Sequence, residues 1–168
     1  MNTEITVRKA NSKDINTVLE IFKKAISVMD ANGISQWDDI YPDETILYDD
    51  IQNGQMFLGE IDGKIVSVFV LNQVCDEEYK NGNWNDKQSS FAVIHRFCVN
   101  ANFQNIGIGT KTMQIIEEMV KEKNIEAIRL DAFSLNPYAL KMYKNLGYIN
   151  AGEVNWRKGL FYLFEKKL

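Results

Sequence analysis

The sequence predicts a mixed α/β fold in which a single sheet carries helices on its faces. Short stretches in which apolar and polar residues alternate, typical of strands, are interspersed with stretches of helical periodicity. Two predicted strands, 91–99 and 127–133, are almost continuously apolar, as expected of strands covered on both faces. The order of elements is β-α-(α)-β-β-β-α-β-α-β-β, and this order excludes a doubly wound sheet.

The composition indicates one compact domain spanning residues 1–168. Of these residues 45% are hydrophobic and 25% charged, which is ordinary for a globular protein. The net charge is −4 and the pI about 5.1, so we expect no nucleic-acid partner, because such proteins usually carry a basic face. A mildly acidic surface suits a cationic small substrate, but it equally serves solubility. One histidine and two cysteines cannot form a Cys/His zinc site, and we expect no metal.

No segment indicates export or a membrane. The start, Met1-Asn2-Thr3-Glu4, lacks the basic and apolar regions of a secretory signal. The longest apolar run, 65–71, is interrupted by Ser67 and is far too short to cross a bilayer. We therefore expect a cytoplasmic protein with no membrane partner.

The first half of the chain predicts a strand, a helix and a hairpin. Ile5 and Val7 alternate with polar residues, and a helix follows that ends at Gly33. Residues 34–50 predict a surface loop with one short helix. Two strands flank Asp62-Gly63, a dipeptide that suits a type I′ turn. The helix carries its apolar residues at helical spacing, namely Ile15, Val18, Leu19, Phe22, Ile26 and Met29.

The second half predicts two more helices and the remaining strands. Residues 75–90 are polar and predict a loop or a loosely ordered insertion. The apolar strand 91–99 contains two conspicuous polar residues, His95 and Arg96. Further along the chain we expect a helix at 108–123, a strand at 127–133, a helix from Asn136-Pro137 to Gly147, and closing strands at 148–156 and 160–164.

A glycine-punctuated turn between strand 91–99 and the following helix suits a diphosphate. Backbone N–H groups at a helix start have no partner within the helix, and glycines let an anion approach them. A Walker A loop is excluded, because Gly109-Thr110-Lys111 has the wrong order, and a dinucleotide fingerprint lacks its third glycine at Thr112. Taken alone, the turn also fits a simple capped helix start.

The wider context resembles the GNAT superfamily of N-acetyltransferases. The pattern Gln-x-x-Gly-x-Gly at 104–109 is followed by Arg129-Leu130-Asp131-Ala132 and by the segment Asn136-Pro137-Tyr138-Ala139 through Gly147-Tyr148. The match runs from about Phe91 to Tyr148 and is weaker elsewhere. It implies a mostly antiparallel central sheet flanked by helices, with a splay between the two central strands.

The resemblance implies acetyl-CoA as the cofactor. The pantetheine arm would pair with the backbone of Phe97, Cys98 and Val99, and Asn136 would contact that arm. Asn105 replaces the family's usual basic or glycine residue, which removes a possible charge but keeps the backbone cradle. The pyrophosphate would rest on the amides of Gln104, Asn105, Ile106, Gly107, Ile108, Gly109 and Thr110.

The catalytic expectations combine the resemblance with acid–base chemistry. Tyr143 matches the tyrosine near the thioester sulfur, and a phenol of pKa about 10 can protonate a departing thiolate of pKa about 8.5. An amide at Cys98 or Val99 would polarise the thioester carbonyl. His95 is the candidate base, because histidine is the only side chain here naturally poised near neutrality. It lies two residues before Phe97 and is expected to share a face with Val93, Phe97 and Val99. A structural histidine with a water chain as the base is the alternative.

The acceptor is expected to be a primary amine of a small molecule or a peptide. Trp37 and Tyr41 would contact it by cation–π interactions, with Asp38 or Asp39 supplying charge. The opposite wall of this pocket would be Tyr79 and Trp84. An ordinary solvated loop explains the same residues equally well.

Two further expectations concern the protein as a whole. Exposed edges of the closing strands favour a homodimer. A non-catalytic acyl-CoA-binding or sensor domain is the alternative to an enzyme. This alternative arises because one histidine on a strand is the only candidate side chain for the general base.

Overall fold

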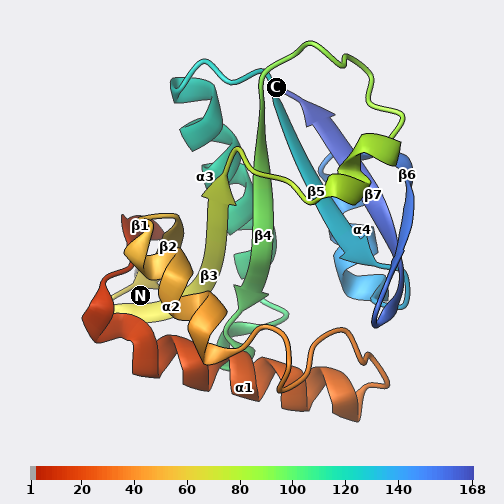
Figure 1. Cartoon of the computed structure of the whole chain (residues 1–168). Coiled ribbons are helices and arrows are strands. Elements are labelled where there is room, and N and C mark those ends of the chain that lie inside the picture. The colour runs from red at the N-terminus through yellow and green to blue at the C-terminus, as the bar shows by residue number, and fades with distance from the viewer. Residues whose placement is uncertain (1–2) are drawn as a thin grey trace. The chain divides into compact units, whose positions relative to one another are not determined.

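The computed structural model describes residues 3–168, and their elements follow the predicted order (Figure 1). They form one seven-stranded sheet in the order β1-β2-β3-β4-β5-β7-β6. Only β4 and β5 pair in parallel among the pairings described, which confirms a mixed, mostly antiparallel sheet. The elements are β1 Thr6–Lys9, α1 Ile15–Ala31, α2 Glu44–Gln52, β2 Met56–Ile61, β3 Lys64–Asn72, β4 Phe91–Val99, α3 Ile108–Glu122, β5 Ala127–Phe133, α4 Pro137–Asn145, β6 Ile149–Trp156 and β7 Gly159–Lys167.

The chain divides into two compact units, which are described separately. Unit 1 is the chain through Leu71 together with Arg96–Thr112, and unit 2 is Asn72–His95 together with Met113–Leu168. The boundary therefore falls within β4, between His95 and Arg96, and within α3, between Thr112 and Met113. A single domain stays a prediction.

Unit 1 is built on the β2–β3 hairpin. Asp62 and Gly63 have φ values of 49° and 74°, and Ile61 pairs with Lys64 across them. Two consecutive positive φ values define a type I′ turn, so the predicted turn is confirmed. The helix α1 ends as predicted near Gly33, whose φ is 74°. The unit's core contains Val18, Phe22, Trp37, Leu47, Met56, Leu58, Val68, Val70 and Cys98.

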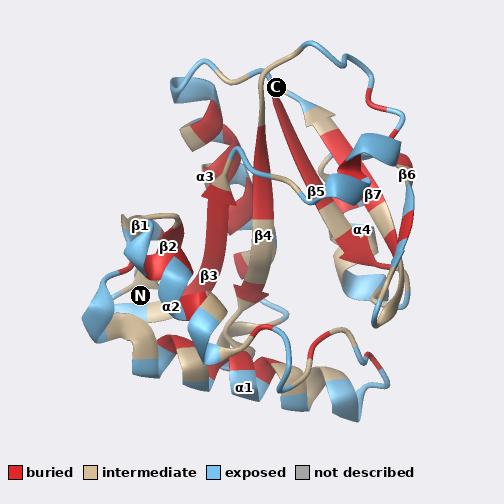
Figure 2. Ribbon diagram, in the orientation of Figure 1, coloured by how far each residue is buried: buried red, intermediate tan, exposed pale blue. Residues whose placement is uncertain are grey.

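Unit 2 is built on the antiparallel ladders of β5, β7 and β6. The β5–β7 ladder pairs all seven residues of Ala127–Phe133, and β5 is buried along most of its length (Figure 2). By contrast, β4 pairs with β5 at only three residues, Phe91–Val93. A parallel ladder that stops after three pairs agrees with the splay implied for the central strands.

The polar segment 75–90 is more regular than the sequence predicts. A short 3-10 helix spans Glu77–Asn81, and the side chains of Tyr79 and Trp84 are buried. The rest of the segment is loop, as predicted, and these two aromatic side chains anchor it within unit 2. No helix among residues 3–168 is long and apolar enough to cross a membrane.

Candidate functional site

The turn before α3 has the backbone geometry of an anion cradle. Asn105 and Gly107 have φ values of 63° and 83°, and the first helical hydrogen bond runs from Lys111 N to Gly107 O at 3.1 Å. Amides ahead of Lys111 thus lie outside the helical hydrogen-bond pattern, at the positive end of α3. A Cβ at Gly107 would meet no atom within 4 Å, so the space beside this backbone is open. Successive amides of this kind form a concave site for an anion.

The conformation of Asn105 explains its departure from the family pattern. Asparagine tolerates the left-handed region far better than most residues, and glycine tolerates it best. The position therefore accepts asparagine or glycine for the same conformational reason.

Contacts with β3 hold the turn in place within unit 1. Asn100 donates from its backbone N to Val66 O at 2.9 Å and from Nδ2 to Ile65 O at 2.8 Å. Thr112 Oγ1 lies 2.9 Å from Ser67 Oγ, and both residues are fully buried. The hydroxyl of Thr112 thus joins the first turn of α3 to the sheet, at the position where a dinucleotide fingerprint would have glycine.

The strand that precedes the turn is interrupted at Arg96. Its φ is 48°, although the residue lies inside β4. Because regular alternation of side chains is interrupted at a left-handed residue, strand periodicity alone no longer implies that His95 shares a face with Phe97 and Val99, and that shared face stays a prediction. The sequence marks Arg96 as an unusual polar residue in this strand, but it gives no sign of its backbone conformation.

Arg96 makes a network with two residues from outside the sheet. Its Nε and Nη2 donate to Asp50 Oδ2 and Oδ1 at 2.8 and 2.6 Å, and its Nη1 donates to the Tyr41 hydroxyl at 2.9 Å. The paired side chains of Arg96 and Asp50 are only 13% and 10% exposed. Sequence reasoning missed Asp50, because nothing in an acidic helical segment distinguishes a buried carboxylate from a solvated one.

The predicted acceptor loop in unit 1 is ordered by its own side chains. Trp37 is buried against Phe22, with ring centroids 5.3 Å apart. Asp38 Oδ1 accepts hydrogen bonds from the backbone N of Ile40 and Tyr41, both at 3.0 Å. Asp38 thus forms the turn that presents Tyr41 to Arg96. Contact of Trp37, Asp38 and Tyr41 with an acceptor stays a prediction.

Two oxygen atoms lie close to Nε2 of His95, in unit 2. Its Nε2 lies 2.9 Å from Val74 O and 2.9 Å from Asn72 Oδ1. A backbone carbonyl can only accept, so Nε2 carries the hydrogen and a neutral imidazole accepts a proton at Nδ1. A base role for His95 would therefore be carried by Nδ1.

The helix α4 and its caps position Tyr143. The side chain of Asn136 accepts from Ala139 N at 3.1 Å and caps the helix start, where Pro137 follows. At the other end, Tyr148 N donates to Tyr143 O at 3.0 Å after Gly147, whose φ is 89°. This is a Schellman ending, and it brings the rings of Tyr143 and Tyr148 to 5.7 Å. The Gly147-Tyr148 pair thus ends α4 and places the Tyr143 ring against the Tyr148 ring.

The hydroxyl of Tyr143 remains protonated at neutral pH. Burial raises the pKa of Tyr143 above its ordinary value, and the charge of Asp131 raises it further. The phenol proton therefore remains available for a departing anion. Asp131 is a second residue that sequence reasoning left without a role.

Tyr79 and Trp84 lie packed in unit 2 rather than exposed on a loop. Tyr79 is 2% exposed and donates its hydroxyl to Asp131 Oδ2 at 2.7 Å, and Trp84 Nε1 donates to Tyr79 O at 2.7 Å. Burial and the charge of Asp131 raise the pKa of Tyr79 well above its usual value. Their place in an acceptor pocket stays a prediction, and little of either side chain is exposed for it.

The two cysteines should differ sharply in reactivity. Burial raises the pKa of the Cys98 thiol to about 12, whereas Cys75 is partly exposed. Because burial both disfavours the Cys98 thiolate and shields the thiol, we expect a disulfide reagent to titrate one thiol quickly in the native protein and both in denaturant. A Cys75→Ser variant should lose the fast phase, and a fast phase that persists in it would contradict this assignment.

The fold and the turn together define a class of proteins, namely mixed, mostly antiparallel α/β domains with a turn suited to an anion at a helix start. Solved structures share this fold. An acetyltransferase of the GNAT family from Streptococcus agalactiae has a TM-score of 0.88 at 21% identity, over 100% of this chain and 98% of that one. The PaiA N-acetyltransferase of Thermoplasma acidophilum, in complex with coenzyme A, has a TM-score of 0.70 at 18% identity, over 99% and 100%.

A third structure is the ribosomal-protein-S18-alanine N-acetyltransferase of Escherichia coli, with a TM-score of 0.71 at 15% identity over 98% of this chain and 94% of that one. No curated protein matches the sequence. The sequence profile of the acetyltransferase (GNAT) family matches residues 17–148, well over half of the chain. This protein belongs to the GNAT acetyltransferase family, which uses acetyl-CoA, so the predicted family and cofactor are confirmed.

Proposed function

We propose that this protein transfers the acetyl group of acetyl-CoA to a primary amine of a small molecule or peptide, by direct attack of the amine on the thioester. The observation that carries the proposal is the turn before α3, where Asn105 and Gly107 adopt positive φ beside open space. Such a turn fits the pyrophosphate of the donor through the amides of Gln104 to Thr110.

The proposed chemistry assigns each proton to a residue. The amine nitrogen forms a bond to the carbonyl carbon while the carbon–sulfur bond breaks, and an amide of Cys98 or Val99 stabilises the oxyanion. Tyr143 donates its phenolic proton to the leaving sulfur, which suits a hydroxyl that stays protonated. His95 through Nδ1, or a water chain, removes the proton of the amine. Phe97 and Asn136 are proposed to hold the pantetheine arm.

Binding and turnover test the proposal separately. Acetyl-CoA at 100 times its Kd should stabilise the native state by about 2.7 kcal/mol, which appears as a higher melting temperature. Release of free thiol should then be measured against polyamines, amino acids, drug-like amines and peptides. The absence of any thermal shift with CoA compounds would contradict the proposal. Binding without turnover across the panel would instead favour the acyl-CoA sensor. A cytoplasmic location and a homodimer remain predictions.

The turn itself is tested by adding a single methyl group. A Gly107→Ala variant places a Cβ on the cradle and strains a φ of 83°, so we expect acetyl-CoA affinity to fall by about 10- to 100-fold. Gly33→Ala is the matched control, because Gly33 has a φ of 74° and its added Cβ also meets no atom within 4 Å. Both variants should lose similar stability, and calorimetry should show that only Gly107→Ala weakens CoA binding. Equal affinities in the two variants would exclude the turn as the pyrophosphate site.

A further inference from the structure

Arg96 differs in residue type and in location from the other non-glycine residues that have a positive φ. Besides glycines, residues 3–168 contain four residues with positive φ, and the other three are Asp62, Asn105 and Asn124. Aspartate and asparagine tolerate this region, and those three lie in turns. Arginine inside a strand has no such tolerance. Its conformation persists only when surrounding contacts enforce it, and backbone strain of this kind concentrates at functional sites.

The contacts that enforce it form what we call the Arg96 clamp: Arg96, Asp50 and Tyr41. The clamp joins β4 to α2 and to the loop before α2, across 46 and 55 residues of sequence. A guanidinium bound to both carboxylate oxygens is fixed in direction as well as in distance, which a single ammonium contact cannot achieve. The clamp therefore fixes the direction in which the backbone continues from Arg96 to Phe97.

Stability alone is a poor explanation for the clamp. A nearly buried ion pair is often no more stabilising than apolar side chains of the same volume, because both charges lose their hydration. The clamp also lies one residue before Phe97-Cys98-Val99, the backbone on which we place the acetyl-CoA arm and its oxyanion-binding amide. Its third member, Tyr41, belongs to the predicted acceptor loop. Arg96 thus directly precedes the proposed donor strand in sequence, and its guanidinium donates to Tyr41 of the proposed acceptor loop, both in unit 1.

We propose that Arg96 is a positioning residue, which, held by Asp50 and Tyr41, sets the direction of the Phe97–Val99 backbone for acetyl transfer. This inference rests on the proposed function. The clamp acts on the orientation of the thioester more than on the affinity for the cofactor, since the turn that holds the pyrophosphate has its own supports on β3 at Asn100 and Thr112. Misplacement of reacting groups by a fraction of an ångström lowers rate before it lowers affinity.

The test compares two arginine clamps in the same unit. Arg8 donates from Nη1 and Nη2 to Asp14 at 2.8 and 2.9 Å and from Nε to Glu60 at 2.9 Å, in a strand without positive φ. Arg8→Lys and Arg96→Lys each lose a forked contact and keep the charge. We expect Arg96→Lys and Asp50→Asn to lower kcat by about 10- to 100-fold with a change in the Kd of CoA below about threefold. Arg8→Lys should keep the kcat of the wild type.

A second variant separates backbone positioning from the charge of Arg96. Two double variants are compared, Asp50→Asn/Arg96→Lys and Asp50→Asn/Arg96→Gly. Glycine adopts a φ of 48° without strain, so it can keep this backbone conformation without the clamp. We therefore expect the variant with glycine to have a higher kcat than the variant with lysine. Equal kcat losses in Arg8→Lys and Arg96→Lys, or unchanged kcat in Asp50→Asn, would overturn the inference.

Hydrogen exchange makes the inference independent of turnover. With CoA bound, the amides of Cys98 and Val99 should exchange faster in Arg96→Lys than in Arg8→Lys and the wild type. If the wild type turns over no amine, the proposed function fails, and this comparison still decides whether the clamp orders the strand. Unchanged exchange of both amides in Arg96→Lys would then overturn the positioning role.

Discussion

A Tyr143→Phe variant is expected to lower kcat by about 10²- to 10⁴-fold, the usual contribution of a general acid. The substitution removes only the hydroxyl, and the ring keeps its contacts with Tyr148 and Phe164, whose centroids lie 5.7 and 6.0 Å away. The affinity for acetyl-CoA should therefore change little. Steady-state kinetics on the best amine, together with calorimetry for CoA, separate these two effects.

Tyr148→Phe is the matched control for this variant. Its hydroxyl is buried, and burial and the charge of Glu117 raise the pKa of Tyr148, so removing this hydroxyl should change kcat little, and any loss of stability is read separately by denaturant unfolding. If Tyr143→Phe turned over at the rate of Tyr148→Phe, Tyr143 would not be the acid.

The pH profile gives an additional check on Tyr143. Because burial and Asp131 raise the pKa of Tyr143, the folded protein keeps the phenol protonated to a higher pH than an unfolded chain does. We expect no loss of kcat from its ionisation below about pH 10, the ordinary value for tyrosine. The stability that this group contributes is present below that pH and is lost only as the pH rises above it.

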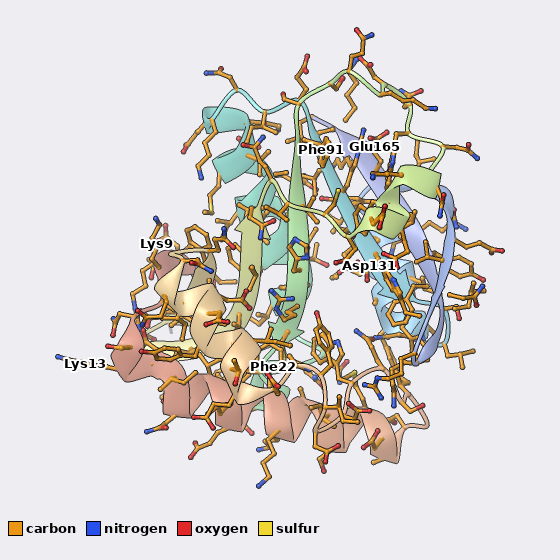
Figure 3. All side chains as sticks on the ribbon, viewed as in Figure 1. Lys9, Lys13, Phe22, Phe91, Asp131 and Glu165 are labelled. Atoms are coloured by element: carbon orange, nitrogen blue, oxygen red, sulfur yellow. The ribbon has the colours of Figure 1, made fainter. Side chains whose placement is uncertain are left out.

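Replacement of Arg129 by methionine should cost about 3–5 kcal/mol of unfolding free energy, because it leaves Glu165 buried without its cation. Arg129 Nε donates to Glu165 Oε2 at 2.8 Å, and the guanidinium lies 4.3 Å from the ring centroid of Trp84 and 3.9 Å from that of Phe91. Figure 3 shows Phe91 and Glu165 near one another at one end of unit 2, with Asp131 further along β5. Denaturant unfolding measures the loss.

Two further variants give this prediction its controls. Lys121→Met removes an exposed pair with Glu118, whose side chains are 47% and 68% exposed, and should cause no measurable loss. Arg129→Met/Glu165→Gln should be more stable than Arg129→Met alone, because no unpaired charge remains. If Arg129→Met were as stable as Lys121→Met, the ion pair would contribute nothing.

Arg129 and Glu165 also hold the segment that carries two residues of the proposed acceptor pocket. Arg129 Nη2 donates to Asp86 O at 3.1 Å, and Asn85 N donates to Glu165 Oε1 at 2.9 Å. These bonds hold the segment 75–90, which carries Tyr79 and Trp84. Arg129→Met should therefore loosen this segment first, and proteolysis near Asp86 would report it.

Turns and helix ends that depend on neighbouring residues in the chain were predictable from the amino-acid sequence. The type I′ turn at Asp62-Gly63, the ends of α1 and α4 near Gly33 and Gly147, and the helix start after Gly107 all follow from local dihedral preferences. The family signature is also local, since it consists of such turns at fixed spacing between Gln104 and Tyr148. This is why the order of elements and the cofactor were predictable.

The pairing of charged and aromatic side chains followed from long-range packing and could not be predicted from local sequence. The partners of Arg96 and Arg129 lie 36 to 55 residues away in sequence, and Tyr79 finds Asp131 across 52. Burial makes these pairings selective, because a charge that loses its hydration must find a partner of fixed geometry. No local pattern distinguishes Asp50 from the other acidic residues of its helix. The left-handed break at Arg96 has the same origin, since contacts from α2 and its preceding loop enforce a conformation that the local sequence disfavours.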